Sequence, residues 1–152
     1  MGGKIDVCIG IPTRNSERTI KKCLASIIAN SFPKDKMQII IVDNLSSDNT
    51  LRYAKEILEP SGINFKIFSN EVIGAIGRSR QIVVNNCNAD YVLWIDSDAI
   101  IPPTFIHNQL QYIKQNRAAI VFPYAILALN TDNILARMQG YAWSISTMIA
   151  LK

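Results

Sequence analysis

Hydrophobic residues along this chain follow two spacings that alternate from the N-terminus onward. Short, largely apolar runs rich in β-branched side chains predict buried strands. These runs lie at Val7–Ile11, Ile39–Val42, Phe65–Phe68, Tyr91–Ile95 and Ala119–Phe122. The first ends at Pro12, and polar turn residues follow the second and the third, which favours strands over fragments of helix.

Between these runs, apolar residues recur three or four positions apart, the spacing of one helix face. The first such set follows Ser16, a candidate helix cap, and comprises Ile20, Cys23, Leu24, Ile27 and Ile28. Further helices are expected from Thr50 to Glu59, from Arg78 to Asn86, after Pro102 and Pro103, and in a tail from about Asp132. The last has apolar residues at Met138, Tyr141, Ile145, Met148 and Ile149.

The alternation of strand and helix with short loops predicts an α/β fold. We expect a doubly wound, mostly parallel sheet flanked by helices on both faces. The length of 152 residues suits one domain, and no linker or repeat divides it, so residues 1–152 are taken as a single unit.

Composition narrows the partners only slightly. The net charge of +4 suits an anionic ligand, an anionic membrane surface, or simply a soluble basic protein. Lysines and arginines are dispersed, so no nucleic-acid partner is expected. Cys8, Cys23 and Cys87 form no metal-binding spacing and are expected to be buried free thiols. The opening MGGKID lacks the apolar core of a signal peptide, so a cytoplasmic location is expected.

Three polar clusters stand where the predicted strands end. They are Pro12-Thr13-Arg14-Asn15, Asp43-Asn44 and Asp96-Ser97-Asp98. Ligands of open parallel sheets bind beyond the carboxyl ends of the strands, so these clusters are expected to share one site. The first cluster precedes a helix, where backbone amides could hold an anion, or where Asn15 or Ser16 could simply cap the helix.

Asp96 and Asp98 carry the sharpest chemistry. Two carboxylates spaced i, i+2 after a strand can reach one hard cation, such as Mg²⁺ or Mn²⁺, or one metal–diphosphate unit. The alternative is that this pair belongs to a solvated turn. A carboxylate at Asp43 could accept hydrogen bonds from a base or ribose, and the alternative there is again turn chemistry. His107, the lone histidine, is expected to have a surface or packing role.

The loop from Asn70 to Gln81 carries Gly74 and Gly77, which allow close approach of the backbone to a ligand. Arg78 and Arg80 could reach a phosphate, and their i, i+2 spacing would turn only one of them inward. The alternative is a flexible surface loop with solvated arginines.

Four blocks in this order resemble the family 2 glycosyltransferases, which have the Rossmann-like GT-A fold. The blocks are IGIPTRNSERTIKKCLASI, IIIVDNLSSDNT, NEVIGAIGRSRQ and ADYVLWIDSDAIIP. They match the family's P-T-x-N, V-D-(D/N)-x-S-x-D-x-T, glycine-loop and D-x-D segments over about residues 5 to 103.

The resemblance implies a role for each matching residue. Pro12, Thr13 and Asn15 would line a nucleotide pocket, Asp43 would contact the base, and Arg80 would be the loop arginine of the family. Asp96 would lie near the ribose or sugar, and Asp98 would hold the metal, with Asp96 beside it. The donor would be a UDP- or GDP-linked sugar, and the metal Mg²⁺ or Mn²⁺.

The implied reaction is metal-dependent, inverting transfer of the sugar to an unidentified acceptor. Gln81 and Asn44 replace the family's commoner Asn and Asp. No residue matches the catalytic base, which relatives carry in a longer C-terminal acceptor part. A donor-binding remnant without turnover is therefore one alternative, and a phosphohydrolase with Asp96 as nucleophile is another.

The tail helix completes these expectations. Its apolar stripe would pack on the chain's own sheet, on a second copy of the chain, or on the inner face of the membrane.

Overall fold

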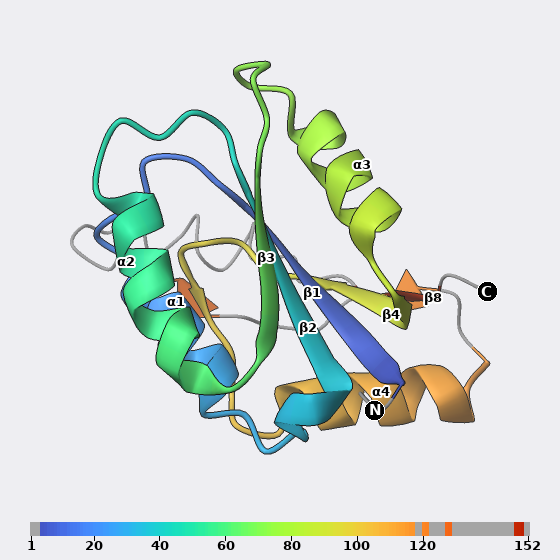
Figure 1. Ribbon diagram of the computed structural model, residues 1–152. Helices are drawn as coiled ribbons and strands as arrows, with labels where there is room; N and C mark the ends of the chain where they lie inside the picture. The colour runs from blue at the N-terminus through green and yellow to red at the C-terminus, as the bar shows by residue number, and fades with distance from the viewer. Residues whose placement is uncertain (1–3, 118–119, 122–126, 129–147, 151–152) are drawn as a thin grey trace.

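Four parallel strands form the centre of the protein (Figure 1). The computed structural model describes residues 4–117, 120–121, 127–128 and 148–150. The central strands are β1 (Ile5–Thr13), β2 (Met37–Asp43), β3 (Asn64–Ser69) and β4 (Ala89–Trp94). They lie in the order β3-β2-β1-β4, so the chain reverses its direction of winding between β1 and β4. The predicted doubly wound α/β fold is confirmed.

Two antiparallel strands extend this sheet beyond β4. β8 (Met148–Ala150) pairs with β4, and β6 (Ile120–Val121) pairs with β8. The prediction that Met148 and Ile149 belong to a helix is therefore wrong, and the rest of that predicted helix lies outside the described residues. Without β8, the edge of β4 would present a row of unpaired backbone N–H and C=O groups. The hydrogen bonds that Met148 and Ile149 make with this edge favour a strand over the helix that their side-chain spacing predicts.

The helices cover both faces of the sheet (Figure 1). They are α1 (Ile20–Ile28), α2 (Thr50–Leu58), α3 (Ile76–Asn86) and α4 (Phe105–Gln115), with short 3₁₀ turns at Lys34–Lys36 and Glu59–Ser61. The first two and α4 bury apolar side chains in one core with Ile9 and Ile41. On the other face, Val83 of α3 packs with Cys8 and Trp94.

The four central strands are longer than the apolar pattern predicts, whereas β6 as described is shorter than the predicted run and the helix ends shift in both directions. Hydrogen bonding rather than hydrophobicity sets these ends. Ile95 lies just past β4 but still donates its N–H to the carbonyl of Gly10. Glu59, expected in α2, lies in the 3₁₀ turn, and α3 begins at Ile76 rather than Arg78. A small two-stranded sheet of β5 (Ala99–Ile100) and β7 (Leu127–Ala128) was not predicted.

The cysteines are free, as expected, but only Cys8 and Cys23 are fully buried. Cys87 is half-buried against the core that contains Cys8. A hydrogen bond with the Cys8 thiol lowers the pKa of Cys87 to about 7, and the same contact raises the pKa of Cys8.

Candidate functional site

The loops that follow β1 and β2 are joined by hydrogen bonds between backbone and side chains. Asn15 donates its N–H to Ser46 Oγ, Ser16 to Thr50 Oγ1 and Glu17 to Asp48 Oδ2, all between 2.7 and 3.1 Å. Side chains of the β2 loop therefore already accept the hydrogens of these three amides, which are not free to hold an anion.

Ser16 does not cap α1 either. The helix begins at Ile20, and Thr19 occupies the cap position. The Ser16 carbonyl instead accepts from the N–H groups of Thr19 and Ile20, which forms a turn before the helix. Its hydroxyl lies 2.8 Å from the hydroxyl of Ser97, in the loop after β4. Ser16 thus connects the loop after β1 to the Asp96–Asp98 segment.

The glycine loop, residues 70–75 between β3 and α3, is held by two buried asparagines. Asn44 donates from Nδ2 to the carbonyls of Asn70 and Val72 at 2.7 and 2.8 Å, and its Oδ1 accepts from Gly74 N–H at 2.8 Å. Asn70 donates from Nδ2 to the Ala75 carbonyl and to Ser79 Oγ. Gly74 has φ +76°, which an L residue adopts only under strain.

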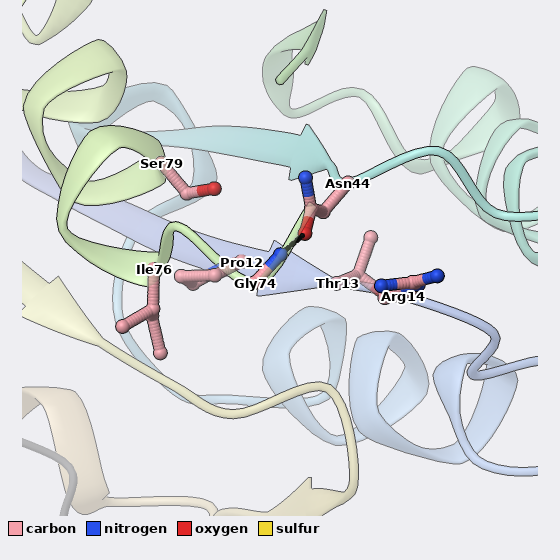
Figure 2. Close-up of a pocket in the computed structure, with 7 residues that line it drawn as sticks. All are labelled: Pro12, Thr13, Arg14, Asn44, Gly74, Ile76 and Ser79. Atoms are coloured by element: carbon pink, nitrogen blue, oxygen red, sulfur yellow. Dashed lines mark hydrogen bonds between the residues drawn. The ribbon is translucent and has the colours of Figure 1, made fainter. Parts of the chain in front are cut away.

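A cavity of about 250 Å³ opens between this loop and the end of β1, and we call it the glycine-loop pocket. Figure 2 shows its lining: Pro12, Thr13, Arg14, Asn44, Gly74, Ile76 and Ser79. Thr13 is 4% exposed, and its hydroxyl has no hydrogen-bond partner within the described part of the chain. A buried hydroxyl without a partner is costly, so this atom is suited to a ligand group.

A wider cavity of about 570 Å³, the aspartate pocket, opens where β1 and β4 end. Its lining consists of Pro12, Arg14, Asn15, Ser16, Glu17, Arg18, Thr19, Asp48, Asp96, Ser97 and Asp98. Pro12 and Arg14 line both cavities. A single extended ligand could therefore pass from one pocket to the other along the end of β1.

Burial raises the pKa of the half-buried Asp96 carboxyl, and the negative charge of Asp98 raises it further. The guanidinium of Arg80 partly offsets both effects. The guanidinium carbon of Arg80 lies 5.6 Å from the centroid of the Trp94 ring. This contact brings a residue of α3 close to the end of β4. Below the pair, Cys23 donates from its thiol to the Asp96 carbonyl. Two carboxylates that repel each other at a pocket wall favour binding of a cation.

Most of the residues singled out from the sequence meet at these cavities. Thr13 lines the first, Asn15, Asp96 and Asp98 line the second, and Pro12 lines both. Asp43 is buried and lines neither, because its carboxylate accepts from the N–H and hydroxyl of Ser46. Arg80 also lines neither, although its charge reaches Asp96.

Sequence reasoning missed the residues that hold the loops together. The sequence pattern placed Asn44 in the Asp43-Asn44 cluster and marked it as a variant of the family's Asp, and it placed Asn70 at the start of the glycine loop, but it assigned neither residue to holding the loops. Their residue type alone could have indicated this role, since Asn is favoured where a side chain must form hydrogen bonds with nearby backbone. The partners themselves are distant in sequence and leave no local pattern.

Among the residues with a described structure, no three histidine, cysteine, aspartate or glutamate side chains gather as a metal cluster. In that same part of the chain, none of the helices combines the length and hydrophobicity needed to cross a membrane. His107 is exposed on α4, in agreement with the expected surface role.

The four sequence blocks, the strand order and the two cavities can now be compared with known proteins. The family model described as Glycosyl transferase family 2 matches residues 8–148. The chain belongs to this family. Several curated members are similar to the chain over most of its length.

One is the poly(ribitol-phosphate) beta-N-acetylglucosaminyltransferase TarS of Staphylococcus aureus, 27% identical over 112 residues, which are 73% of this chain and 19% of TarS. Another is a Methanococcus voltae dolichyl N-acetyl-alpha-D-glucosaminyl phosphate 3-beta-D-2,3-diacetamido-2,3-dideoxy-beta-D-glucuronosyltransferase, 27% identical over 147 residues. That match covers 91% of this chain and 44% of the relative. The family 2 chain thus spans less than half the length of both.

Solved glycosyltransferases share the fold. Residues 1–349 of S. aureus TarS in complex with UDP-GlcNAc match with a TM-score of 0.75 and 24% identity, over 86% of this chain and 37% of that TarS fragment. The mannosyltransferase PcManGT of Pyrobaculum calidifontis, in complex with GDP-Man and Mn²⁺, matches with a TM-score of 0.78 and 17% identity. That match covers 97% of this chain and 45% of PcManGT. The fold is therefore that of the GT-A glycosyltransferases.

Proposed function

We propose that this chain binds a nucleotide-activated sugar, with the nucleoside in the glycine-loop pocket and the diphosphate in the aspartate pocket. The observation that carries the proposal is the junction of the two cavities at Pro12 and Arg14, beside the Asp96–Asp98 pair. Structural neighbours in complex with UDP-GlcNAc and with GDP-Man support a donor of this class. The base is uracil or guanine in this proposal.

Each residue then has a role. The Thr13 hydroxyl bonds to the nucleoside, Pro12 forms the wall between the pockets, and Asn15 lies at the diphosphate end. Asp96 lies near the ribose or sugar, and Arg80 balances its charge. Asp43 is buried, lines neither pocket and accepts from Ser46, so its predicted base contact requires the β2 loop to move.

We propose further that Asp98, with Asp96, holds Mg²⁺ or Mn²⁺. The chemistry of the two side chains fits such an ion, because both offer hard oxygen ligands, and because burial and then the charge of Asp98 raise the pKa of Asp96. Two carboxylates leave most ligand positions to diphosphate oxygens and water, as Mg²⁺ sites commonly do. A bound divalent ion would neutralise charge on the departing diphosphate.

In the reaction proposed for the whole protein, the sugar passes with inversion from the diphosphate to an acceptor. The described residues supply the donor half of that reaction. Residues 1–152 are therefore proposed to form a donor-binding unit. A second candidate is a donor-binding protein without turnover, which needs only the two pockets and the Asp96–Asp98 pair.

Titration calorimetry with UDP and GDP, with and without Mn²⁺, tests the proposal. Binding of one nucleotide that strengthens with Mn²⁺, and loses that dependence in Asp98→Asn, is the expected result. Asp48→Asn is the matched control, because Asp48 lines the same pocket but bonds to Thr50. Failure of both nucleotides to bind with metal present contradicts the proposal.

A sugar-transfer assay with the corresponding nucleotide sugar then separates the two candidates. Turnover supports the transferase, whereas binding without turnover supports the donor-binding protein. Phosphatase activity that disappears in Asp96→Asn would instead support a phosphohydrolase.

A further inference from the structure

The glycine loop presents two carbonyls and one N–H to position 44, and a side-chain amide is their complement. Asn70 O and Val72 O face the NH₂ group of Asn44, and Gly74 N–H faces its oxygen. We propose that Asn44 is the positioning residue of the nucleotide site, and that the glycine loop of this chain requires an amide at position 44, where the family more commonly has an Asp. This inference rests on the proposed function, because it assigns the loop's purpose to nucleotide binding.

Hydrogen bonds, rather than burial, fix the shape of this loop. Val72, Ile73 and Ile76 are 45%, 59% and 53% exposed, so the apolar side chains of the segment contribute little packing. Asn44 is only 8% exposed and Asn70 only 1%. A loop with exposed apolar side chains and buried amides at its base depends on those amides for its order.

Asn70 extends the same network to the strands and to α3. Its backbone N–H donates to the Asp43 carbonyl at 2.7 Å, and its Oδ1 accepts from Val72 N–H. The backbone N–H of Asn44 donates to the Thr13 carbonyl at 2.8 Å. Asn44 therefore connects the end of β1, where the Thr13 hydroxyl has no partner among the described residues, to the loop that forms the opposite wall.

The hydrogen bond from Gly74 N–H to Asn44 Oδ1 joins two residues of the glycine-loop pocket lining, as Figure 2 shows. Gly74, Ile76 and Ser79 line the pocket only while the loop keeps this path. A carboxylate at position 44 could still accept from Gly74. It would, however, place one negatively charged oxygen where Nδ2 lies, 2.7 and 2.8 Å from the two carbonyl oxygens, and it would lose both N–H donors.

The first experiment compares Asn44→Asp and Asn44→Ala with Asn30→Asp and Asn30→Ala. Asn30 is a matched control because it is 6% exposed, donates to the Pro102 carbonyl and accepts from Phe32 N–H, yet lines neither pocket. Calorimetry at pH 8 uses whichever of UDP and GDP the wild type binds with Mn²⁺. We expect about tenfold weaker binding or worse in both Asn44 variants and no change in the Asn30 variants.

A pH series separates positioning from a general loss of structure. Protonation gives the introduced carboxyl at position 44 one donor, so the affinity of Asn44→Asp relative to wild type should recover in part at pH 5.5. Arg14 is the charged residue of the pocket lining, and the neighbouring Asp43 carboxylate is bonded to Ser46. Asn44→Ala, which cannot be protonated, should show no such recovery.

Amide hydrogen exchange measures the loop without a nucleotide. Exchange of Gly74 N–H should accelerate about tenfold or more in Asn44→Ala and stay unchanged in Asn30→Ala. An unchanged Gly74 exchange rate, or nucleotide binding by Asn44→Asp equal to wild type, would overturn this inference alone. If the wild type binds neither nucleotide, the proposed function fails, and the assignment of Asn44 to a nucleotide site fails with it.

Discussion

The hydroxyl groups of Ser16 and Ser97 lie 2.8 Å apart, although 81 positions separate them in the sequence. Ser16 follows β1, and Ser97 stands between the two aspartates that follow β4. Both serines line the aspartate pocket, so their hydrogen bond joins its two walls. Substitution of either serine therefore tests whether the two loops meet at this pocket.

Ser97→Ala should lower the free energy of unfolding by about 1 kcal/mol, since the Ser16 hydroxyl loses its partner in the other loop. Ser16→Ala should cost a similar amount, and the double variant should cost little more than either. A double-mutant cycle by urea denaturation measures this coupling. Fully additive effects of the two substitutions would show that the serines do not interact.

Asp96→Asn should stabilise the nucleotide-free protein at pH 7 and weaken Mn²⁺-dependent nucleotide binding about 10- to 100-fold. Burial and Asp98 raise the pKa of Asp96 in the folded state. A carboxyl with a raised folded pKa contributes stability below its unfolded pKa and loses it as the pH rises through the folded value. Thermal denaturation from pH 3 to 8 should show the gain at neutral pH and its disappearance below the ordinary value of 3.8.

Asp48→Asn should behave in the opposite way. Although burial opposes it, hydrogen bonds from Thr50 and from the Glu17 N–H lower the pKa of Asp48. Its contribution to stability is present above the unfolded pKa and is lost as the pH falls through the folded value. A rise in the melting temperature of Asp48→Asn at pH 7 would contradict this assignment.

Thr13→Val should leave the stability of the protein unchanged or raise it slightly, because the buried hydroxyl bonds to no described protein group. The same change should weaken nucleotide binding about tenfold, by removal of one hydrogen bond to the nucleoside. Thr50→Val is the control of opposite sign, because the Thr50 hydroxyl donates to Asp48 and accepts from Ser16 N–H. Thr13→Val with unaltered nucleotide affinity would remove Thr13 from the site.

Gly10→Ala should destabilise the protein by about 1–3 kcal/mol through overpacking. A Cβ at Gly10 would lie 2.6 Å from the Trp94 ring and 2.8 Å from a Val83 methyl group. Gly77→Ala is the matched substitution in α3, where nothing lies within 4 Å, and it should stabilise by about 0.4–1 kcal/mol. Urea denaturation of the two variants gives both values, and equal effects would contradict the packing described for β1.

The apolar pattern predicted the four parallel strands because residues such as Ile40 and Ile41 are buried on opposite faces of the sheet. A strand covered on both sides must be apolar throughout, and a sequence displays that requirement locally. The pattern failed at Met148, because a neighbouring strand edge decided its structure. The residues of the candidate site could be predicted because they follow strand ends, which are local features of the sequence. Their contacts could not, because which strand ends lie side by side depends on the order of strands in the sheet.

The sequence by itself determined the fold class, the family and the residues that stand at the ends of β1, β2 and β4. Tertiary structure alone decided that Asn44 holds the glycine loop, that Ser16 meets Ser97, and that the amides after β1 are occupied by the β2 loop. Those contacts join residues 30 to 81 positions apart in the sequence. Hydrogen-bond partners at such distances are fixed by the sheet's strand order, which brings the loops to one edge, and no local periodicity records them.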